Sequence, residues 1–183
     1  GRFVRDHENW IRGKLADLPR TITPTYGDSF PLGGRDRLLE RVNGHVVRIM
    51  PDALGVPGPE GCIGAKLRAC CIMVARERLT ERARIHADKL KQRIARITLR
   101  DTRSRWGSCS TEGNLMFSWR LAMAPPEVLD YVVAHEVAHL LEMNHSAHFW
   151  AQVALLVPGY RAPRRWLRDN GPVLLSYRFR GDS

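Results

Sequence analysis

The most regular pattern of hydrophobic and polar positions lies between residues 65 and 90. Apolar side chains recur there at helical spacing, as on one face of an α-helix. We therefore expect one long helix over this range, with its opposite face in solvent. The apolar positions are Leu67, Cys71, Val74, Leu79, Ala83, Ala87 and Leu90.

Three further segments are predicted from similar patterns. Residues 2–18 form an amphipathic pattern that ends at prolines. The apolar positions in 149–156 predict a helix that covers the core, and 160–167 predict a short basic helix. Residues 171–183 are expected to form a strand or a tail.

Strand signals occupy two parts of the chain. Residues 38–42 and 45–50 flank an Asn-Gly pair, which is typical of a tight β-hairpin. Residues 93–99 and 114–120 alternate in the manner of strands. Together with the helices they predict an α+β fold with a small, mostly antiparallel sheet.

A loop rich in glycine and proline between residues 52 and 64 is the best candidate for a boundary. It separates an N-terminal section, residues 1–60, from the remainder, residues 61–183. The first section holds the predicted N-terminal helix and hairpin, and the sequence leaves open whether the two sections share one core.

The residues most suited to chemistry lie in an otherwise uncharged stretch, residues 131–141. His135 and His139 stand one helical turn apart, so they can converge on one Zn²⁺. Glu136 projects to the side, where it can reach a metal-bound water without being a ligand. The alternative is a pair of histidines that hydrogen-bond inside a core.

His145 is the first candidate for a third zinc ligand. It lies six residues after the second histidine, as in the metzincin motif, but Glu142 stands where that motif has glycine. The helix must then end near Met143, with Asn144 as a left-handed exit. Glu142 and His148 are alternative ligands, and Glu142 is also a candidate acceptor for a histidine N–H.

Four segments carry a resemblance to a known family: RSRWGSCS (103–110), NLMFSWRL (114–121), PPEVLDYVVAHEVAHLLEMNHSAHFW (125–150) and VPGYRAPRRWL (157–167). Together they resemble the YgjP-like family of predicted zinc metallopeptidases, which is related to SprT-like domains and belongs to the zincin group. The resemblance implies a zincin-like α+β fold and a zinc site, with residues 61–183 as the metallopeptidase domain. It assigns the metal to His135, His139 and His145, and a catalytic role to Glu136.

The net charge of +10 is concentrated in one region. Residues 66–105 contain thirteen Lys or Arg and four Asp or Glu, a difference of +9. A stripe of Arg78, Arg82, His86 and Lys89 follows one face of the long helix. This suggests a nucleic-acid partner, while the absence of a nucleic-acid-binding motif favours a solvated helix face.

The cysteines and the lengths of the apolar runs indicate the cellular compartment. The four cysteines form no C-x-x-C pair, and we expect free thiols in a reducing cytoplasm. The start of the chain is too charged for a signal peptide, and no apolar run reaches the length of a membrane span. Cys109 as a nucleophile with His135 as its base is disfavoured, because the surrounding order of residues differs from that of papain-like enzymes.

These features predict a cytoplasmic, zinc-dependent peptidase. Zn²⁺ lowers the pKa of its water and polarises the scissile carbonyl, while Glu136 accepts the proton and passes it to the leaving amine. An extended peptide is expected to add to the strand at 114–120. The candidates for stabilising the oxyanion are Tyr131, His148, Arg120 and Tyr160.

Two other functions fit the same residues. One is a nucleic-acid-associated module with a structural zinc site, which requires four protein ligands. The other is a SprT-like protease that acts on DNA-bound proteins and uses the basic stretch for binding DNA.

Overall fold

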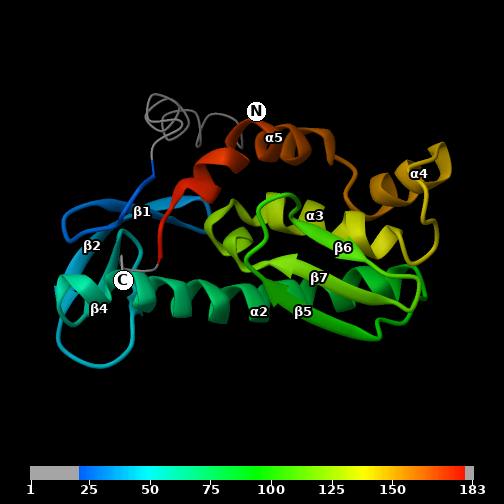
Figure 1. The fold of residues 1–183 in the computed structure, drawn as a ribbon. Helices are drawn as coiled ribbons and strands as arrows, with labels where there is room; N and C mark the ends of the chain where they lie inside the picture. The colour runs from blue at the N-terminus through cyan, green and yellow to red at the C-terminus, as the bar shows by residue number, and fades with distance from the viewer. Residues whose placement is uncertain (1–20, 180–183) are drawn as a thin grey trace.

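The computed structural model describes residues 21–179, which form a mixed α+β fold (Figure 1). The helix predicted at residues 2–18 lies outside the described residues. The strands are β1 (Ser29–Leu32), β2 (Arg35–Val42), β3 (Arg48–Ile49), β4 (Ala53–Pro57), β5 (Arg96–Arg100), β6 (Gly107–Cys109) and β7 (Asn114–Ser118). The helices are α2 (Ile63–Lys89), α3 (Pro126–Ala138), α4 (Ala147–Leu156) and α5 (Arg161–Ser176), with 3-10 turns η1 (Glu60–Cys62) and η2 (Trp119–Met123).

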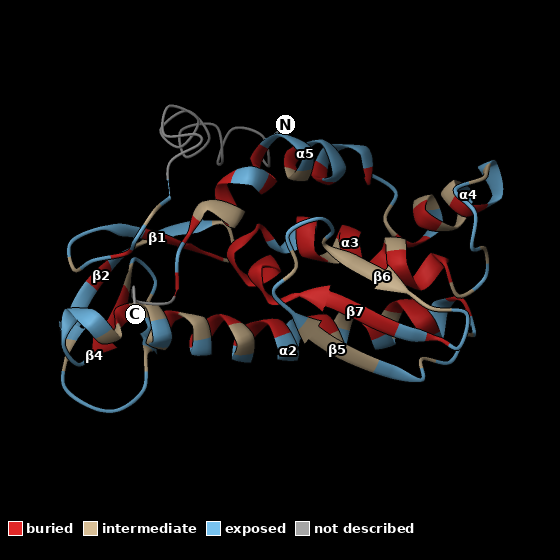
Figure 2. Cartoon of the chain, viewed as in Figure 1, coloured by how far each residue is buried: buried red, intermediate tan, exposed pale blue. Residues whose placement is uncertain are grey.

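Helix α2 runs along the molecule and contacts both sheets, which confirms the pattern found between residues 65 and 90 (Figure 1). It packs against η2 and α3, and its apolar positions are buried (Figure 2). Lys91 then takes a left-handed conformation with φ of 56°. The N–H of Gln92 donates to the carbonyl of Ala87 at 2.9 Å, which closes the end of the helix.

The first sheet has the strand order β1-β2-β4-β3. The hairpin predicted around residues 43–44 is wrong, because β4 lies between β2 and β3, parallel to β2 and antiparallel to β3. Leu54 and Val56 of β4 are fully buried, whereas Arg48 and Ile49 of β3 are exposed. Burial of the apolar strand beside β2 outweighs the turn preference of the Asn-Gly pair.

The second sheet has the order β5-β7-β6, with β7 parallel to β5 and antiparallel to β6. The expected small sheet is thus realised as two sheets, each with both kinds of pairing. The strands predicted at 93–99 and 114–120 correspond to β5 and β7. However, β7 is central and not an edge, since Leu115 and Phe117 are buried in the core. The edge beside α3 is β6, which the sequence pattern did not predict.

The C-terminal helix is longer than the pattern at 160–167 predicted. Helix α5 continues through Pro172 to Ser176, where we expected a strand or tail. A Cβ at Gly171 would lie 3.1 Å from the Trp106 ring, so glycine permits a close approach that a larger residue could make only if Trp106 shifted. Val173 and Leu174 are buried, and their burial offsets the helical hydrogen bond that proline lacks. The helix predicted at 149–156 is confirmed by α4.

One hydrophobic cluster includes residues on both sides of the predicted boundary. Phe30 and Leu54 belong to it, together with Leu67, Phe117 and Phe149. Residues of both sections thus belong to one cluster, and the division at residue 60 stays a prediction.

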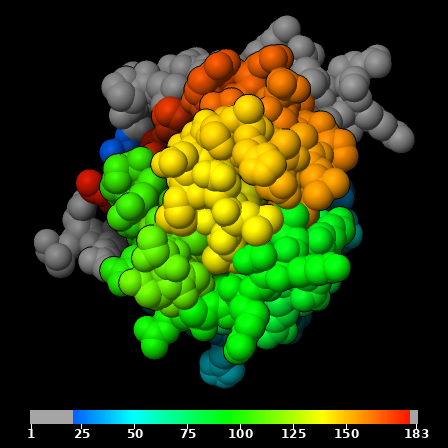
Figure 3. Space-filling view, turned by 90° about the vertical axis from the view of Figure 1, so that its right-hand side faces the viewer, coloured from blue at the N-terminus to red at the C-terminus, as the bar shows by residue number. Residues whose placement is uncertain are grey.

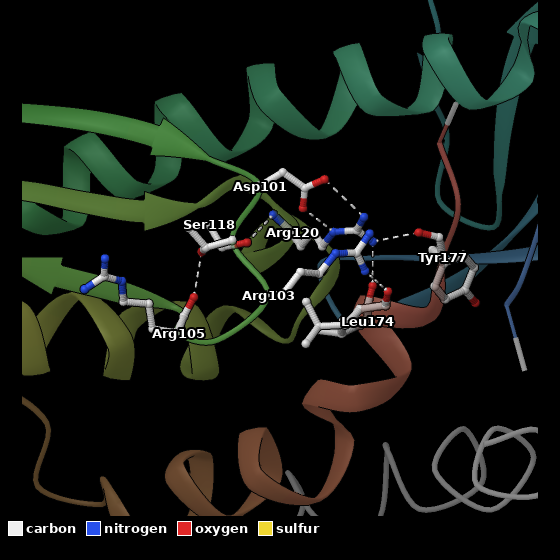
Figure 4. A network of polar contacts seen from close by, with 9 residues as sticks. Asp101, Arg103, Arg105, Ser118, Arg120, Leu174 and Tyr177 are labelled. Carbon is white, nitrogen blue, oxygen red and sulfur yellow. Dashed lines mark hydrogen bonds and ion pairs between the residues drawn. The ribbon is translucent and has the colours of Figure 1, made fainter. Parts of the chain in front are cut away.

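Arg120 is the most deeply buried charged side chain of the described residues, at 1% exposure (Figure 4). Its Nε donates to Asp101 at 2.7 Å, and its Nη1 donates to the carbonyls of Leu174 at 2.9 Å and Tyr177 at 2.8 Å. The guanidinium also lies 4.9 Å from the Phe179 ring centre. This network, the Arg120 network, fastens the end of α5 to η2 and to the segment after β5.

Candidate metal centre

Helix α3 presents the histidine motif from a buried support. Pro126 occupies its first turn, where a missing N–H costs nothing. Val133, Ala134 and Val137 are fully buried. His135 is only half-buried on the side that faces α4. The apolar face thus anchors the helix and leaves His135 partly exposed, while Glu136 and His139 are buried.

The three predicted histidines converge. The ligand nitrogens of His135, His139 and His145 all lie within 4.8 Å of one another. The Nε2 atoms of His135 and His145 are 3.2 Å apart. Two nitrogens bound tetrahedrally to one zinc at its usual bond length stand about 3.3 Å apart, so the spacing fits a shared ion. We call these residues the histidine cluster.

The chain reaches His145 by a different path from the one predicted. Helix α3 ends at Ala138, with His139 as its cap, and not near Met143. Tight turns follow, since the N–H groups of Leu140 and Leu141 donate to the carbonyls of residues 137 and 138. Lys91 is the one non-glycine residue in the described chain with a left-handed backbone, so the exit expected at Asn144 is wrong. The early end of the helix lets the chain double back over the motif.

The hydrogen bonds of the three rings leave one nitrogen of each ring directed toward the other two rings. Nδ1 of His139 donates to the backbone carbonyl of Glu142 at 3.0 Å, which directs its Nε2 to the cluster. Glu142 was expected to accept with its carboxylate, yet the acceptor is its main chain. Nδ1 of His135 lies 3.4 Å from the Tyr131 hydroxyl. Neither Glu142 nor His148 joins the cluster within the described residues.

Two of the imidazoles, those of His135 and His139, have lowered pKa values that favour the neutral form that metals bind. Burial, the two neighbouring histidines and Arg164 lower the pKa of His135 to about 3. Burial likewise lowers the pKa of His139. The ring of Phe149 stacks on His139 at 4.4 Å and fixes its orientation. Figure 3 shows this end of the molecule, where the yellow and orange atoms of α4 and its neighbours lie over the green segments.

The side chain of Glu136 projects from α3 toward the edge strand β6, and the residue is 7% exposed. A Cβ at Gly107 would lie 2.9 Å from Cγ of Glu136, so the glycine of the W-G-S-C segment makes room for this side chain. Burial raises the pKa of Glu136 to about 7, although the charge of Arg105 opposes the shift. A carboxyl group with such a pKa can exchange protons near neutral pH.

Tyr131, Tyr160 and Trp150 stack in a row beside the histidine cluster, and we call this row the aromatic wall. Tyr160 stacks on Tyr131 at 6.4 Å and on Trp150 at 5.3 Å. The guanidinium of Arg164 lies 4.4 Å from the Trp150 ring centre, and Trp150 lies 5.7 Å from His135. The sequence pattern did not single out Arg164 or Arg105, because both were counted only as general charge. Their place in the segments that carry the family resemblance was the available signal.

The four candidates for oxyanion stabilisation differ in whether their hydrogen-bond donors are free and near the histidine cluster. Arg120 commits its Nε and Nη donors to the network of Figure 4 and is not available. His148 is exposed and makes no ring contact with the histidine cluster in the part of the chain described. Tyr131 and Tyr160 remain, both in the aromatic wall. Burial raises the pKa of Tyr131 to about 12, so its hydroxyl keeps its proton at neutral pH.

Cys109 does not have the properties of a nucleophile. Burial, and the nearby charge of Glu136, raise the pKa of its thiol to about 11. Nucleophilic cysteines require a thiolate, which a raised pKa disfavours. The structure therefore supports a packing role for this residue.

The predicted basic stripe on α2 is interrupted. His86 is fully buried and Arg82 is half-buried, and both contact Asp130 of α3, at 2.7 and 2.6 Å. Arg78 and Lys89 are exposed as expected. Two of the four residues thus join α2 to α3, because an ionised Asp130 facing α2 requires partners.

Two histidines at the end of α3 and a third from the turns that follow lie together beside a buried glutamate, in a mixed α+β fold. The model of the YgjP-like metallopeptidase domain matches residues 1–170, and the chain belongs to that family. No curated protein matches the chain.

Among solved structures, the chain is similar to the crystal structure of the metallopeptidase zymogen of Pyrococcus abyssi abylysin. The identity is 23%, the TM-score is 0.44, and the alignment covers 51% of this chain and 92% of that one. Within residues 21–179, none of the helices has both the length and the apolar character needed to cross a membrane.

Proposed function

We propose that this metallopeptidase domain hydrolyses peptide bonds with a zinc ion held by His135, His139 and His145. The observation that supports this best is the convergence of three imidazoles within 4.8 Å, beside a buried Glu136. Histidine nitrogens suit zinc, and three protein ligands leave a position open for catalysis. A zinc ion held there would polarise the scissile carbonyl and activate a water molecule.

Glu136 acts as the general base. It accepts the proton of the attacking water and transfers it to the leaving amine. Its position against Gly107 keeps it beside the histidine cluster but outside the ligand set. We assign the oxyanion donor to Tyr160, whose hydroxyl forms no hydrogen bond within residues 21–179 and whose ring is held in the aromatic wall.

The substrate adds as an extended strand to β6. The carbonyl of Trp106 accepts from Ser118 at 2.9 Å, and the N–H of Ser110 donates to Asn114 at 3.0 Å. In an antiparallel pair these contacts recur at every second residue, so Gly107 points its backbone groups away from β7. Cys109 does the same. An extended peptide can pair with both residues and then passes over Glu136.

A Glu136→Gln variant tests the proposed peptidase. Gln cannot accept the proton, so we expect zinc content and folding to be unchanged while cleavage falls about a hundred- to ten-thousand-fold. Zinc-loaded wild type and variant are compared against unfolded proteins and peptide libraries, with elemental analysis of each. Equal cleavage by both would assign the activity to another base. Tyr160→Phe is the companion variant, with a smaller rate loss expected at unchanged zinc content.

The alternatives have less support. A structural zinc site requires four protein ligands, and the described residues bring three together. Nucleic-acid binding through residues 66–105, protease action on DNA-bound proteins and a cytoplasmic location stay predictions. The interruption of the basic stripe at Arg82 and His86 removes part of the reason for a nucleic-acid partner.

A further inference from the structure

The second sheet has an open face, opposite α3. The register places Thr98, Met116 and Ser108 in one row across the three strands. Successive residues of a strand point to opposite faces, so Ser108 points away from the side on which Gly107 meets Glu136. The open face is hollowed there, with a volume of about 500 Å³.

This hollow, the arginine hollow, is lined by Arg100 and Arg105 and by polar groups that include Thr98, Ser108 and Asn114. Both arginines are exposed, and neither forms an ion pair within residues 21–179. No aspartate or glutamate of the described chain lines the hollow. The nearby Asp101 is already paired with Arg120. The hollow therefore presents two cations and several hydrogen-bond donors without a protein anion.

The arginine hollow is adjacent to the edge at which the proposed function places the substrate. When a strand pairs with β6, the side chain directly opposite Ser108 lies on the same face as Ser108. That face is the arginine hollow. The side chains before and after it lie on the other face, toward Glu136 and the histidine cluster.

We propose that the arginine hollow is a specificity subsite for an acidic side chain of the substrate. The inference rests on the proposed function and narrows its substrate class to peptides with Asp or Glu at one position near the cleaved bond. Arginine binds carboxylates through paired, charge-assisted hydrogen bonds. Arg105 lies closest in sequence to the edge strand, and Arg100 lines the same hollow from the end of β5.

The test uses the zinc-loaded full chain with Glu136→Gln as a trap that binds without cleaving. The probes are fluorescent peptides of one uncharged sequence, in which a single Glu, Gln or Lys is moved along the chain. Anisotropy should show Glu favoured over Gln at one position by on the order of tenfold. Wild type should cleave the same Glu peptide preferentially, and the position should be constant relative to the cut.

Three variants locate the effect. Arg105→Gln and Arg100→Gln should each reduce the preference for Glu while the Gln peptide binds as before. Arg100→Glu should turn the preference toward Lys, which a mere loss of folding cannot do. Arg96→Gln is the matched control, because Arg96 is exposed on the same strand and does not line the arginine hollow. It should leave the preference unchanged.

The experiment distinguishes failure of the proposed subsite from failure of the proposed peptidase activity. Cleavage with no preference for Glu, or a preference that survives Arg100→Glu, would overturn the subsite and keep the peptidase. A Glu preference in binding without cleavage of any peptide would support the subsite and overturn the peptidase. Absence of peptide binding, with an oligonucleotide bound in a manner that depends on Arg100 and Arg105, would overturn the acidic-peptide subsite in favour of a phosphate site.

Discussion

The histidine cluster and the Arg120 network both place polar groups among apolar side chains, but they differ in the partners of those polar groups. Arg120 has donors paired with Asp101 and with two carbonyls. The histidines have second nitrogens that face one another, and burial keeps His135 uncharged. A network closed by protein acceptors stabilises the fold, whereas histidine nitrogens that face one another are suited to a shared metal ion. The contrast separates residues that hold the structure from residues to which we assign the chemistry.

The largest expected effect is the loss of zinc from a His135→Ala, His139→Ala double variant. With two of three ligands removed, elemental analysis should find no retained zinc and assays no peptidase activity. His148→Ala and Glu142→Gln are the controls, and both should keep about one zinc per chain, because the described cluster excludes them. Full zinc content in the double variant would refute the histidine cluster as the metal site.

Arg120→Met should produce the reverse outcome, a loss of stability with the histidine cluster intact. Removing the buried guanidinium leaves two carbonyls and the partly exposed Asp101 without their donor, and each buried group left so costs about 1–3 kcal/mol in the free energy of unfolding. Denaturant unfolding measures this change. Arg168→Met is the control, since Arg168 and Asp169 are exposed and such a pair contributes less than about 1 kcal/mol. Equal effects of the two variants would contradict the comparison.

Gly107→Ala tests the contact between β6 and the base. The added Cβ would lie 2.9 Å from Cγ of Glu136, so the base must shift. We expect a rate loss of about ten- to a hundredfold, and a stability loss of about 1–3 kcal/mol. Gly61→Ala is the control, because nothing lies within 4 Å of its Cβ position. Rates are measured on peptides, with zinc content as a check on the site.

The smallest expected effect concerns Asp130, which joins α3 to α2. Burial alone would raise its pKa, but hydrogen bonds from His86 and Arg82 outweigh burial and hold the pKa below its ordinary value. Such a group contributes stability above the pKa of the unfolded chain, and the contribution is lost as the pH falls through the lower folded value. Thermal melts between pH 6 and pH 3 should show a decline that is shallower in Asp130→Asn. An unchanged slope would mean that other carboxylates set the acid sensitivity.

The histidines were predictable from the sequence because their spacing matches the turn of a helix. His135 and His139 stand one turn apart, and any helix brings them together. The long helix α2 was predictable for the same reason, since its apolar positions repeat over many turns. The α+β class followed from such local signals.

Pairing between distant segments was not predictable in this way. The Asn-Gly pair at residues 43–44 favours a hairpin locally, yet β4 takes the place beside β2 because its apolar side chains need burial. The same applies to α5, which passes through Pro172 where the pattern predicted a strand or tail. In both cases burial in the core is worth more than the local preference.

The residue types of the proposed site, the helix that carries His135 and Glu136, and the class of fold were predictable from the sequence, because they depend on spacing along one element. Tertiary structure decided the rest. It ended α3 at Ala138 so that His145 could return to the motif, and it placed Gly107 against Glu136. It also separated Arg120, which is satisfied in the core, from Arg100 and Arg105, which face the edge strand. The physical reason is that arginines of identical chemistry differ only in their partners, and partners come from segments far apart in the chain.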